Sequence, residues 1–162
     1  MKNNSDQTFW RTTPLEKFTQ EQWESICDGC AQCCAHKLIN DETEELFLTN
    51  VVCQYLDQNR CRCNVYDNRN EYVPDCIQVT PENAHQLTWM PETCGYKLLA
   101  QRKPLPDWHP LVTGDPSSTS KAQMSVKDKV ISEADINVED LEDYVVESDY
   151  FSRLCRDIGA KI

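Results

Sequence analysis

The sequence predicts a small, irregular α+β domain that is rich in loops and built from short helices. Three observations favour this fold class: proline stands at several helix starts, Asn- and Asp-rich turns fill the middle of the chain, and 10 of its 162 residues are cysteine. A chain of this length has room for one domain with a modest core. The stretch CDGCAQCC, residues 27–34, concentrates four thiols in eight positions, so we expect the domain to be organised around a cysteine metal site.

The composition argues against several classes of function. Asp and Glu number 27 against 16 Lys and Arg, which gives a formal net charge of −11. Such a surface repels phosphate backbones and anionic lipids, so we expect no nucleic-acid partner and no membrane partner, while a protein partner is compatible with it. No apolar run reaches the roughly 18 residues of a membrane span, and residues 1–18 lack the apolar core of a signal peptide. We therefore expect a cytoplasmic protein.

Two helix starts precede the cysteine stretch. Residues 13–16 (TPLE) are typical of a capping box with proline at the first helical position. The signal repeats at Thr19, with Gln22 three residues later and Phe18 in position to pack on Trp23 as a hydrophobic staple. We expect this second helix to lead directly into the cysteines.

The middle of the chain shows few signals of regular structure. An acidic turn leads into a β-rich run at residues 46–52, whereas residues 57–76 are rich in turn-forming residues and irregular. Two further helices are expected to start at Pro81 and Pro91, which puts Cys94 in the first turn of the second. Because residues 57–76 offer little apolar surface, something other than a hydrophobic core must hold them.

The chain is expected to divide into three parts. Residues 1–114 form the cysteine-cluster domain, and residues 115–124 (DPSSTSKAQM) form a polar linker rich in helix breakers. Residues 125–162 form an acidic segment that we expect to pack on the same domain. A strand is expected within residues 124–132 and an amphipathic helix within residues 138–158. We interpret the acidic side chains of this segment as a solvated face.

The spacing of the first cysteines indicates metal binding. Cys27, Cys30 and Cys33 repeat the C-x2-C interval of zinc ribbons, and the same triple begins the ferredoxin pattern, so zinc and iron–sulfur are both open. In a reducing compartment, clustered cysteines more often bind metal or do redox chemistry than form disulfides. Adjacent side chains diverge, so Cys33 and Cys34 are not expected to serve one ion side by side. The two residues would then bind metal ions at two different sites, or Cys34 would be packed in the protein interior or be redox-active.

Five more cysteines follow: Cys53, Cys61, Cys63, Cys76 and Cys94. Nine thiols suffice for two four-thiolate sites with one spare, or for one multinuclear cluster. Thiolates in such numbers repel one another, and nearby cations reduce that cost. The candidate donors of hydrogen bonds to sulfur are Lys37, Arg60, Arg62 and Arg69. These four side chains are equally well explained as ordinary surface charges. The candidate nitrogen ligands are His36, which adjoins the cluster and is favoured, His85 and His109.

These residues resemble the CxxCxxCC cysteine-cluster family, whose members are described as zinc- or iron-chelating domains. The match continues with Cys53, with the spacing Cys63-x2-Tyr66-x2-Arg69, and with Cys76. One departure is that Arg69 is followed by Asn70, where the family has proline. The segments FWRTTPLE, HKLIND and DWHPLVTG are similar to the YcgN-like bacterial branch, and the resemblance spans roughly residues 9–145.

The resemblance implies ligand roles for seven cysteines, and the narrower branch adds Cys94 as an eighth. The implied metal ligands are Cys27, Cys30, Cys33, Cys34, Cys53, Cys63, Cys76 and Cys94. Cys61 is left as the spare thiol, and Cys155 lies outside the site. The implied metal is zinc or iron, an iron–sulfur cluster included.

We expect a metal-binding protein that chelates zinc or iron through clustered thiolates. An iron–sulfur redox protein or enzyme component is the second hypothesis, and a metal-free thiol oxidoreductase is the third. The sequence contains no phosphate-binding glycine loop, nucleotide fingerprint or nucleophile motif, and it indicates no substrate. Whether the protein is an enzyme is left open; if it is one, we expect an iron–sulfur or thiol redox component.

Overall fold

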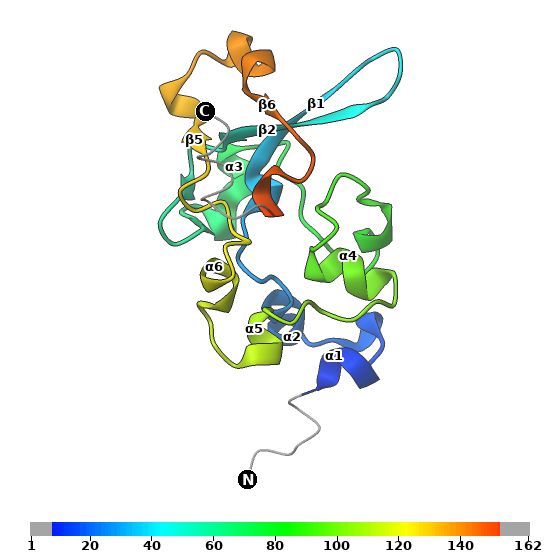
Figure 1. Ribbon diagram of the computed structural model, residues 1–162. Coiled ribbons are helices and arrows are strands. Elements are labelled where there is room, and N and C mark those ends of the chain that lie inside the picture. Colours follow the sequence, from blue (N-terminus) through cyan, green and yellow to red (C-terminus); the bar gives the residue numbers. More distant parts are fainter. Residues whose placement is uncertain (1–7, 153–162) are drawn as a thin grey trace. The chain divides into compact units, whose positions relative to one another are not determined.

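A computed structural model describes residues 8–152 of the chain. They form two compact units, each drawn from two stretches of sequence: the first from residues 8–28 and 77–119, the second from residues 29–76 and 120–152. Short helices, small sheets and long connecting loops make up the chain (Figure 1), which confirms the predicted loop-rich α+β class.

The first unit begins with three short helical segments, α1 (Phe9–Thr12), the 3-10 turn η2 (Leu15–Lys17) and α2 (Gln20–Ser25). The capping box predicted at the start of α2 is confirmed. The Thr19 side-chain oxygen accepts from the Gln22 backbone N–H at 3.1 Å, and the Gln22 side chain accepts from the Thr19 N–H at 3.0 Å.

The capping box predicted at residues 13–16 is wrong. Pro14 directly precedes η2 with an extended backbone, and no side-chain cap forms there. Because the segment makes a single 3-10 turn that starts after Pro14, Thr13 lies one residue too far out to cap it.

Three more helical segments complete the first unit, η5 (Ala84–Gln86), α4 (Gly95–Ala100) and α5 (Pro110–Thr113). The helices expected to start at Pro81 and Pro91 therefore begin later than predicted, and the second is separated from its proline by a loop.

Local hydrogen bonds account for both late starts. The Thr80 N–H donates to Asn83 Oδ1 at 2.8 Å and the Asn83 N–H donates to Thr80 Oγ1 at 3.3 Å, which closes a turn in place of a helix. Lys97 Nζ donates to the Met90 carbonyl at 3.1 Å and so holds the loop before α4. Cys94 has an extended backbone and precedes α4 instead of lying in its first turn.

Aromatic side chains form the core of the first unit. Trp23 and Tyr96 pack with ring centroids 4.6 Å apart, the Tyr96 hydroxyl donates to the Trp23 carbonyl at 2.9 Å, and Trp23 Nε1 donates to the Val79 carbonyl at 3.0 Å. The ring centroids of Phe18 and Trp23 lie 6.4 Å apart, which confirms the predicted staple. Buried rings with satisfied polar tips contribute much of the stability of a small core.

The end of α2 meets the start of α4 at very short range. Ile26 is fully buried, and its carbonyl accepts from Nε2 of the equally buried His109 at 2.8 Å. Nδ1 of His109 accepts from the Leu111 N–H at 3.0 Å, so both ring nitrogens are used within the unit. An ideal Cβ built on Gly95 would lie 2.6 Å from the Ile26 carbonyl oxygen. The chain directly before Cys27 thus touches the chain directly after Cys94.

Substitution of Gly95 is expected to break this contact. In Gly95→Ala the new methyl would overlap a backbone oxygen that cannot rotate away, and we expect a loss of about 2–3 kcal/mol in the free energy of unfolding. Urea denaturation followed by near-UV circular dichroism measures the loss. Gly114→Ala is the control, because Gly114 has φ +74° but open space around its Cβ position, so only about 1 kcal/mol of backbone strain is expected. Equal losses in the two variants would contradict the steric explanation.

The second unit contains a four-stranded sheet. Strands β1 (Ala35–Ile39) and β2 (Leu46–Val52) form an antiparallel hairpin. Strands β5 (Ile131–Ser132) and β6 (Val145–Val146) pair with successive stretches of β2, parallel and antiparallel respectively (Figure 1). The β-rich run predicted at residues 46–52 is therefore confirmed as β2.

A second, smaller hairpin follows β2. It pairs β3 (Leu56–Asp57) with β4 (Arg62–Cys63), and the 3-10 turn η4 (Tyr66–Asn68) and helix α3 (Arg69–Tyr72) come next. Each of these elements is four residues or shorter, as the turn-rich sequence of this part indicates.

The predictions for the C-terminal segment are partly wrong. The strand expected in residues 124–132 shrinks to β5, and the segment expected as a linker contains helix α6 (Ser118–Lys121) with two buried residues. The helix expected from residue 138 is a 3-10 segment, η7 (Val138–Tyr144), followed by β6 and by η8 (Tyr150–Ser152). The β-branched pair Val145 and Val146 binds the edge of β2 and thereby ends the helical run. Cys155 lies outside the described residues.

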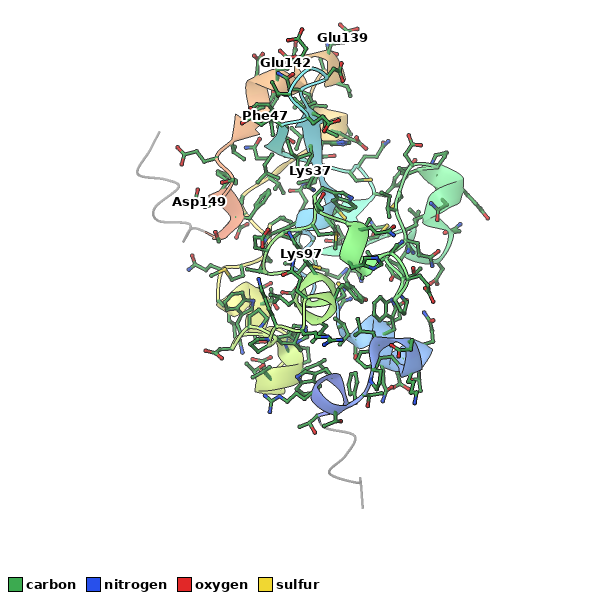
Figure 2. The ribbon with its side chains drawn as sticks, turned by 90° about the vertical axis from the view of Figure 1, so that its right-hand side faces the viewer. Lys37, Phe47, Lys97, Glu139, Glu142 and Asp149 are labelled. Atoms are coloured by element: carbon green, nitrogen blue, oxygen red, sulfur yellow. The ribbon has the colours of Figure 1, made fainter. Side chains whose placement is uncertain are left out.

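A cluster of buried apolar residues forms the core of the second unit, chiefly Val52, Leu56, Val126 and Phe151. Segment η7 packs on β2, and Figure 2 shows its side chains Glu139 and Glu142 at the end of the sheet where Phe47 lies. Among residues 8–152, no helix combines the length and the apolar character that a membrane crossing needs.

Candidate metal centre

Six of the eight predicted ligands lie in the second unit, and two lie in the first. The six are Cys30, Cys33, Cys34, Cys53, Cys63 and Cys76. In the first unit, Cys27 is exposed directly after α2, and Cys94 is buried directly before α4.

The segment that carries the first thiols of the second unit contains two residues with a left-handed backbone. Gly29 and Ala31 both have positive φ, 76° and 61°, and a 3-10 turn, η3 (Gln32–Cys34), follows. The Val126 N–H donates to the Cys30 carbonyl at 2.9 Å, and the Gln32 side chain donates to the Met124 carbonyl at 2.9 Å. These bonds fix residues 30–34 on the segment that leads to β5.

The base of the β1–β2 hairpin brings Cys34 and Cys53 together. The Cys53 N–H donates to the Cys34 carbonyl at 3.1 Å, which continues the hairpin ladder by one rung beyond the pairing of Ala35 with Val52. The Leu56 N–H donates to the Cys53 carbonyl at 3.1 Å, so the turn after β2 holds this residue as well.

The small hairpin and the turn after α3 supply the last two thiols. Cys63 lies on β4 opposite Leu56. Cys76 ends a turn in which its N–H donates to the Val73 carbonyl at 3.0 Å, and Asn70 Nδ2 donates to the Cys76 carbonyl at 2.7 Å. Asn70 stands where the family has proline, and it uses the side-chain amide that proline lacks to hold the backbone of a predicted ligand.

Five of the six thiols, all but Cys30, act on one another electrostatically. A hydrogen bond from the Cys34 thiol to the Cys33 sulfur, together with burial and the charges of Cys33, Cys53 and Cys63, raises the pKa of Cys34 far above its ordinary value. Burial raises the pKa of Cys53, and Glu133, Cys63 and Cys76 add to the effect. The charges of Cys33, Cys53 and Cys63 thus all act on the Cys34 thiol.

Two cationic side chains adjoin this group. The pKa of Cys76 is raised by burial, and Arg69 opposes that rise through its charge and through a hydrogen bond to the sulfur. Burial lowers the pKa of Lys37, and the charges of Cys33, Cys34 and Cys30 oppose this decrease.

Of the other candidate donors, Arg60 is occupied elsewhere. Its Nε donates to Asp57 Oδ2 at 2.9 Å. The hydrogen bond from the Arg60 backbone N–H, and after it the one from the Arg60 side chain, lower the pKa of Asp57.

The favoured nitrogen ligand, His36, bonds a carboxylate. Its Nε2 lies 2.6 Å from Glu133 Oε2, and the other Glu133 oxygen accepts from the Gln54 N–H at 3.0 Å. Cys61 packs in the apolar core, where its thiol donates to the Gln58 carbonyl at 3.7 Å. Sequence reasoning missed Glu133 because 97 residues separate it from His36, and nothing local indicates the pair.

The donor set fits a soft or borderline metal ion. Within residues 8–152, no group of three or more His, Cys, Asp or Glu side chains is placed so that it could hold a metal ion. The chemistry of the six thiols is nevertheless that of zinc and iron ligands, since thiolates bind these metals and His36 is engaged by Glu133. Burial and mutual repulsion favour the protonated form of these thiols. A bound divalent cation would instead stabilise their ionised form, the thiolates.

Comparisons with known proteins place this chain in a family. Residues 26–95 match the CxxCxxCC family model, described as "Putative zinc- or iron-chelating domain". The chain is 51% identical to a UPF0260 protein of Shewanella frigidimarina over 85% of its own length and 92% of that protein. It is 45% identical to a UPF0260 protein of Cellvibrio japonicus, over 88% and 97% of the two chains. No solved structure matches this chain. The chain belongs to the UPF0260 family, and residues 26–95 carry its CxxCxxCC domain.

Proposed function

We propose that the protein binds zinc or iron through the thiolate cluster of its second unit. The observation that carries the proposal is that five thiols from four separate stretches of chain, Cys33, Cys34, Cys53, Cys63 and Cys76, act on one another within one compact unit. Apolar packing does not require such a gathering, because each thiol raises the cost of ionising its neighbours.

The chain's own residues would hold the metal. Cys30, Cys33, Cys34, Cys53, Cys63 and Cys76 are the proposed sulfur donors, and the ligand roles of Cys27 and Cys94 stay predictions from the sequence. When bound, the metal would supply a positive centre that keeps the thiolates ionised, so binding would release protons.

An iron–sulfur cluster is the second candidate. It is favoured by the donor set, which consists of sulfur alone, and by the ferredoxin-like triple of Cys27, Cys30 and Cys33. The protein would then be a redox component of an enzyme system.

We further propose that the protein works in the cytoplasm, where clustered thiols stay reduced. Its net charge of −11 supports a protein partner over nucleic acid or a membrane surface.

Anaerobic purification followed by elemental and acid-labile sulfide analysis tests the proposal. A colourless protein with bound zinc and no sulfide supports a zinc site, and a brown protein with iron and sulfide supports the cluster. A metal-free protein whose thiols titrate reversibly in a redox buffer would overturn metal binding in favour of thiol oxidoreductase chemistry.

A further inference from the structure

The end of the β1–β2 hairpin extends beyond the rest of its sheet (Figure 1). Among the described residues, β5 and β6 pair with residues 48–52 of β2 and with none before them. The hairpin continues for two further rungs, Leu38 opposite Phe47 and Ile39 opposite Leu46. Since β1 pairs with β2 alone, these two rungs have no neighbouring strand on either outer edge within the part of the chain that the structure describes.

Both faces of these last two rungs are apolar. Ile39 and Leu46 share one face and are 63% and 42% exposed. Leu48 lies two residues further along the same face and packs against the core of the second unit, so the covered part of that face ends before Leu46. Leu38 and Phe47 share the other face and are half-buried. A two-stranded ribbon is only marginally stable in water by itself, so a partner that covers these side chains would stabilise it.

Carboxylates surround this apolar end of the hairpin. The turn that closes it, residues 40–45 (NDETEE), carries four exposed acidic side chains. Figure 2 shows Glu139 and Glu142 of η7 at the same end of the sheet. Residues 38–59 and 131–149 contain no lysine and no arginine, and among the described residues no acid of the turn or of η7 forms an ion pair. Such a surface attracts cations and repels other anionic surfaces.

We propose that the apolar end of the β1–β2 hairpin is a docking surface for a cationic segment of a partner protein, in which lysine or arginine alternates with apolar residues. The inference deepens the protein partner proposed above and rests on that part of the proposed function, not on the metal. The partner's apolar side chains would cover Ile39 and Leu46, and its cations would face the surrounding carboxylates. An extended segment would lie along β1 as a further strand, so that every second side chain meets the same face.

The charge of the surface argues against a second copy of this chain as the occupant. A two-fold contact brings the same surface of two copies together. The turn acids and the η7 acids of one copy would then face those of the other, and like charges would oppose the contact.

The test is an NMR titration of the isotope-labelled full chain, purified anaerobically, with a synthetic peptide in which lysine alternates with leucine. We expect the amide signals of residues 38–47 and 138–146 to shift most. A peptide of the same length and charge with serine in place of leucine should bind at least about 10-fold more weakly, because it brings no apolar side chains. Shifts centred elsewhere in the chain, or equal affinities for the two peptides, would overturn the proposal.

A double variant tests the apolar contact. In Ile39→Thr with Leu46→Thr, which keeps residues suited to strands, we expect the Lys–Leu peptide to bind about 10-fold more weakly. Ile77→Thr with Val112→Thr is the matched control, because both residues are exposed and belong to the first unit, and it should bind like the wild type. Equal affinities in the two double variants would overturn the assignment of the surface to the hairpin.

Two triple Glu→Gln variants test the charge. One changes the hairpin end at Glu42, Glu44 and Glu142, and the other changes exposed residues of the first unit, Glu16, Glu21 and Glu82. At low salt we expect the first to bind the Lys–Leu peptide about 10-fold more weakly and the second to bind like the wild type, with the difference removed by high salt. Equal losses in both would show that net charge alone attracts the peptide.

Sedimentation and elemental analysis of the same samples distinguish the remaining outcomes. A dimeric wild-type chain that becomes monomeric in Ile39→Thr with Leu46→Thr would show that a second copy covers the surface, and would overturn the proposal. A metal-free protein that binds the peptide at the hairpin would overturn metal binding alone. A metal-loaded protein that does not bind it would overturn the docking surface alone.

Discussion

Removal of the metal from the native protein is expected to unfold much of residues 27–94. The middle of this segment consists of elements of four residues or fewer, and several of its large side chains, including Tyr66 and Tyr72, are exposed. A structural zinc ion contributes about 10–16 kcal/mol of apparent binding free energy at neutral pH, whereas a whole small domain is stable by about 5–15 kcal/mol. Thiolate–metal bonds can therefore outweigh everything else that holds this part of the chain.

Hydrogen exchange read by mass spectrometry measures this effect before and after anaerobic chelation. We expect the largest gain in exchange at residues 57–76, a smaller gain along β1 and β2, and recovery of protection when the metal is returned. The aromatic core around Trp23 and Tyr96 serves as the internal reference, because its packing and hydrogen bonds involve no thiol. Unchanged protection at residues 57–76 after complete removal of metal would show that the metal does not hold them.

Substitution of Cys34 is expected to be the most damaging single change to metal binding. Cys34 interacts with three other thiols of the cluster, Cys33, Cys53 and Cys63, and its carbonyl binds the Cys53 N–H. In Cys34→Ser we expect affinity for Co²⁺ or Zn²⁺ to fall by more than the roughly 100-fold that loss of a residue beside a ligand costs. Competition with a chelator of known affinity measures the change.

Cys61→Ala is the matched control for that variant. Cys61 lies in the same unit and only two residues from Cys63, but it is buried in the apolar core and its thiol bonds the Gln58 carbonyl. Its replacement should cost some stability and leave the metal content unchanged. Equal losses of metal in the Cys34 and Cys61 variants would mean that the effect comes from disturbed folding and not from a lost ligand.

Local signals in the sequence predicted some of the local structure correctly. The capping box of Thr19 and Gln22 and the staple of Phe18 on Trp23 involve residues within five positions of each other, and both are confirmed. The predicted C-terminal helix is wrong because Val145 and Val146 pair with a strand almost a hundred residues earlier in the chain. Local propensity carries no information about such a partner.

In the candidate site, too, the sequence indicated the local features but not the contacts between distant residues. The density of cysteines indicated a thiol cluster, but four cations were equally good candidates to accompany it. Only the fold shows that one of them, Arg60, bonds Asp57 instead. His36 adjoins the cluster in sequence, yet its ring turns to Glu133, a residue that no spacing rule connects to it.

X-ray absorption at the metal edge of the anaerobically purified protein tests the central claim most directly. We expect a first coordination shell made of sulfur alone, at the roughly 2.3 Å typical of metal–thiolate bonds. A shell dominated by nitrogen or oxygen, or a protein that holds no metal at all, would contradict the claim that these converging thiols exist to bind a metal.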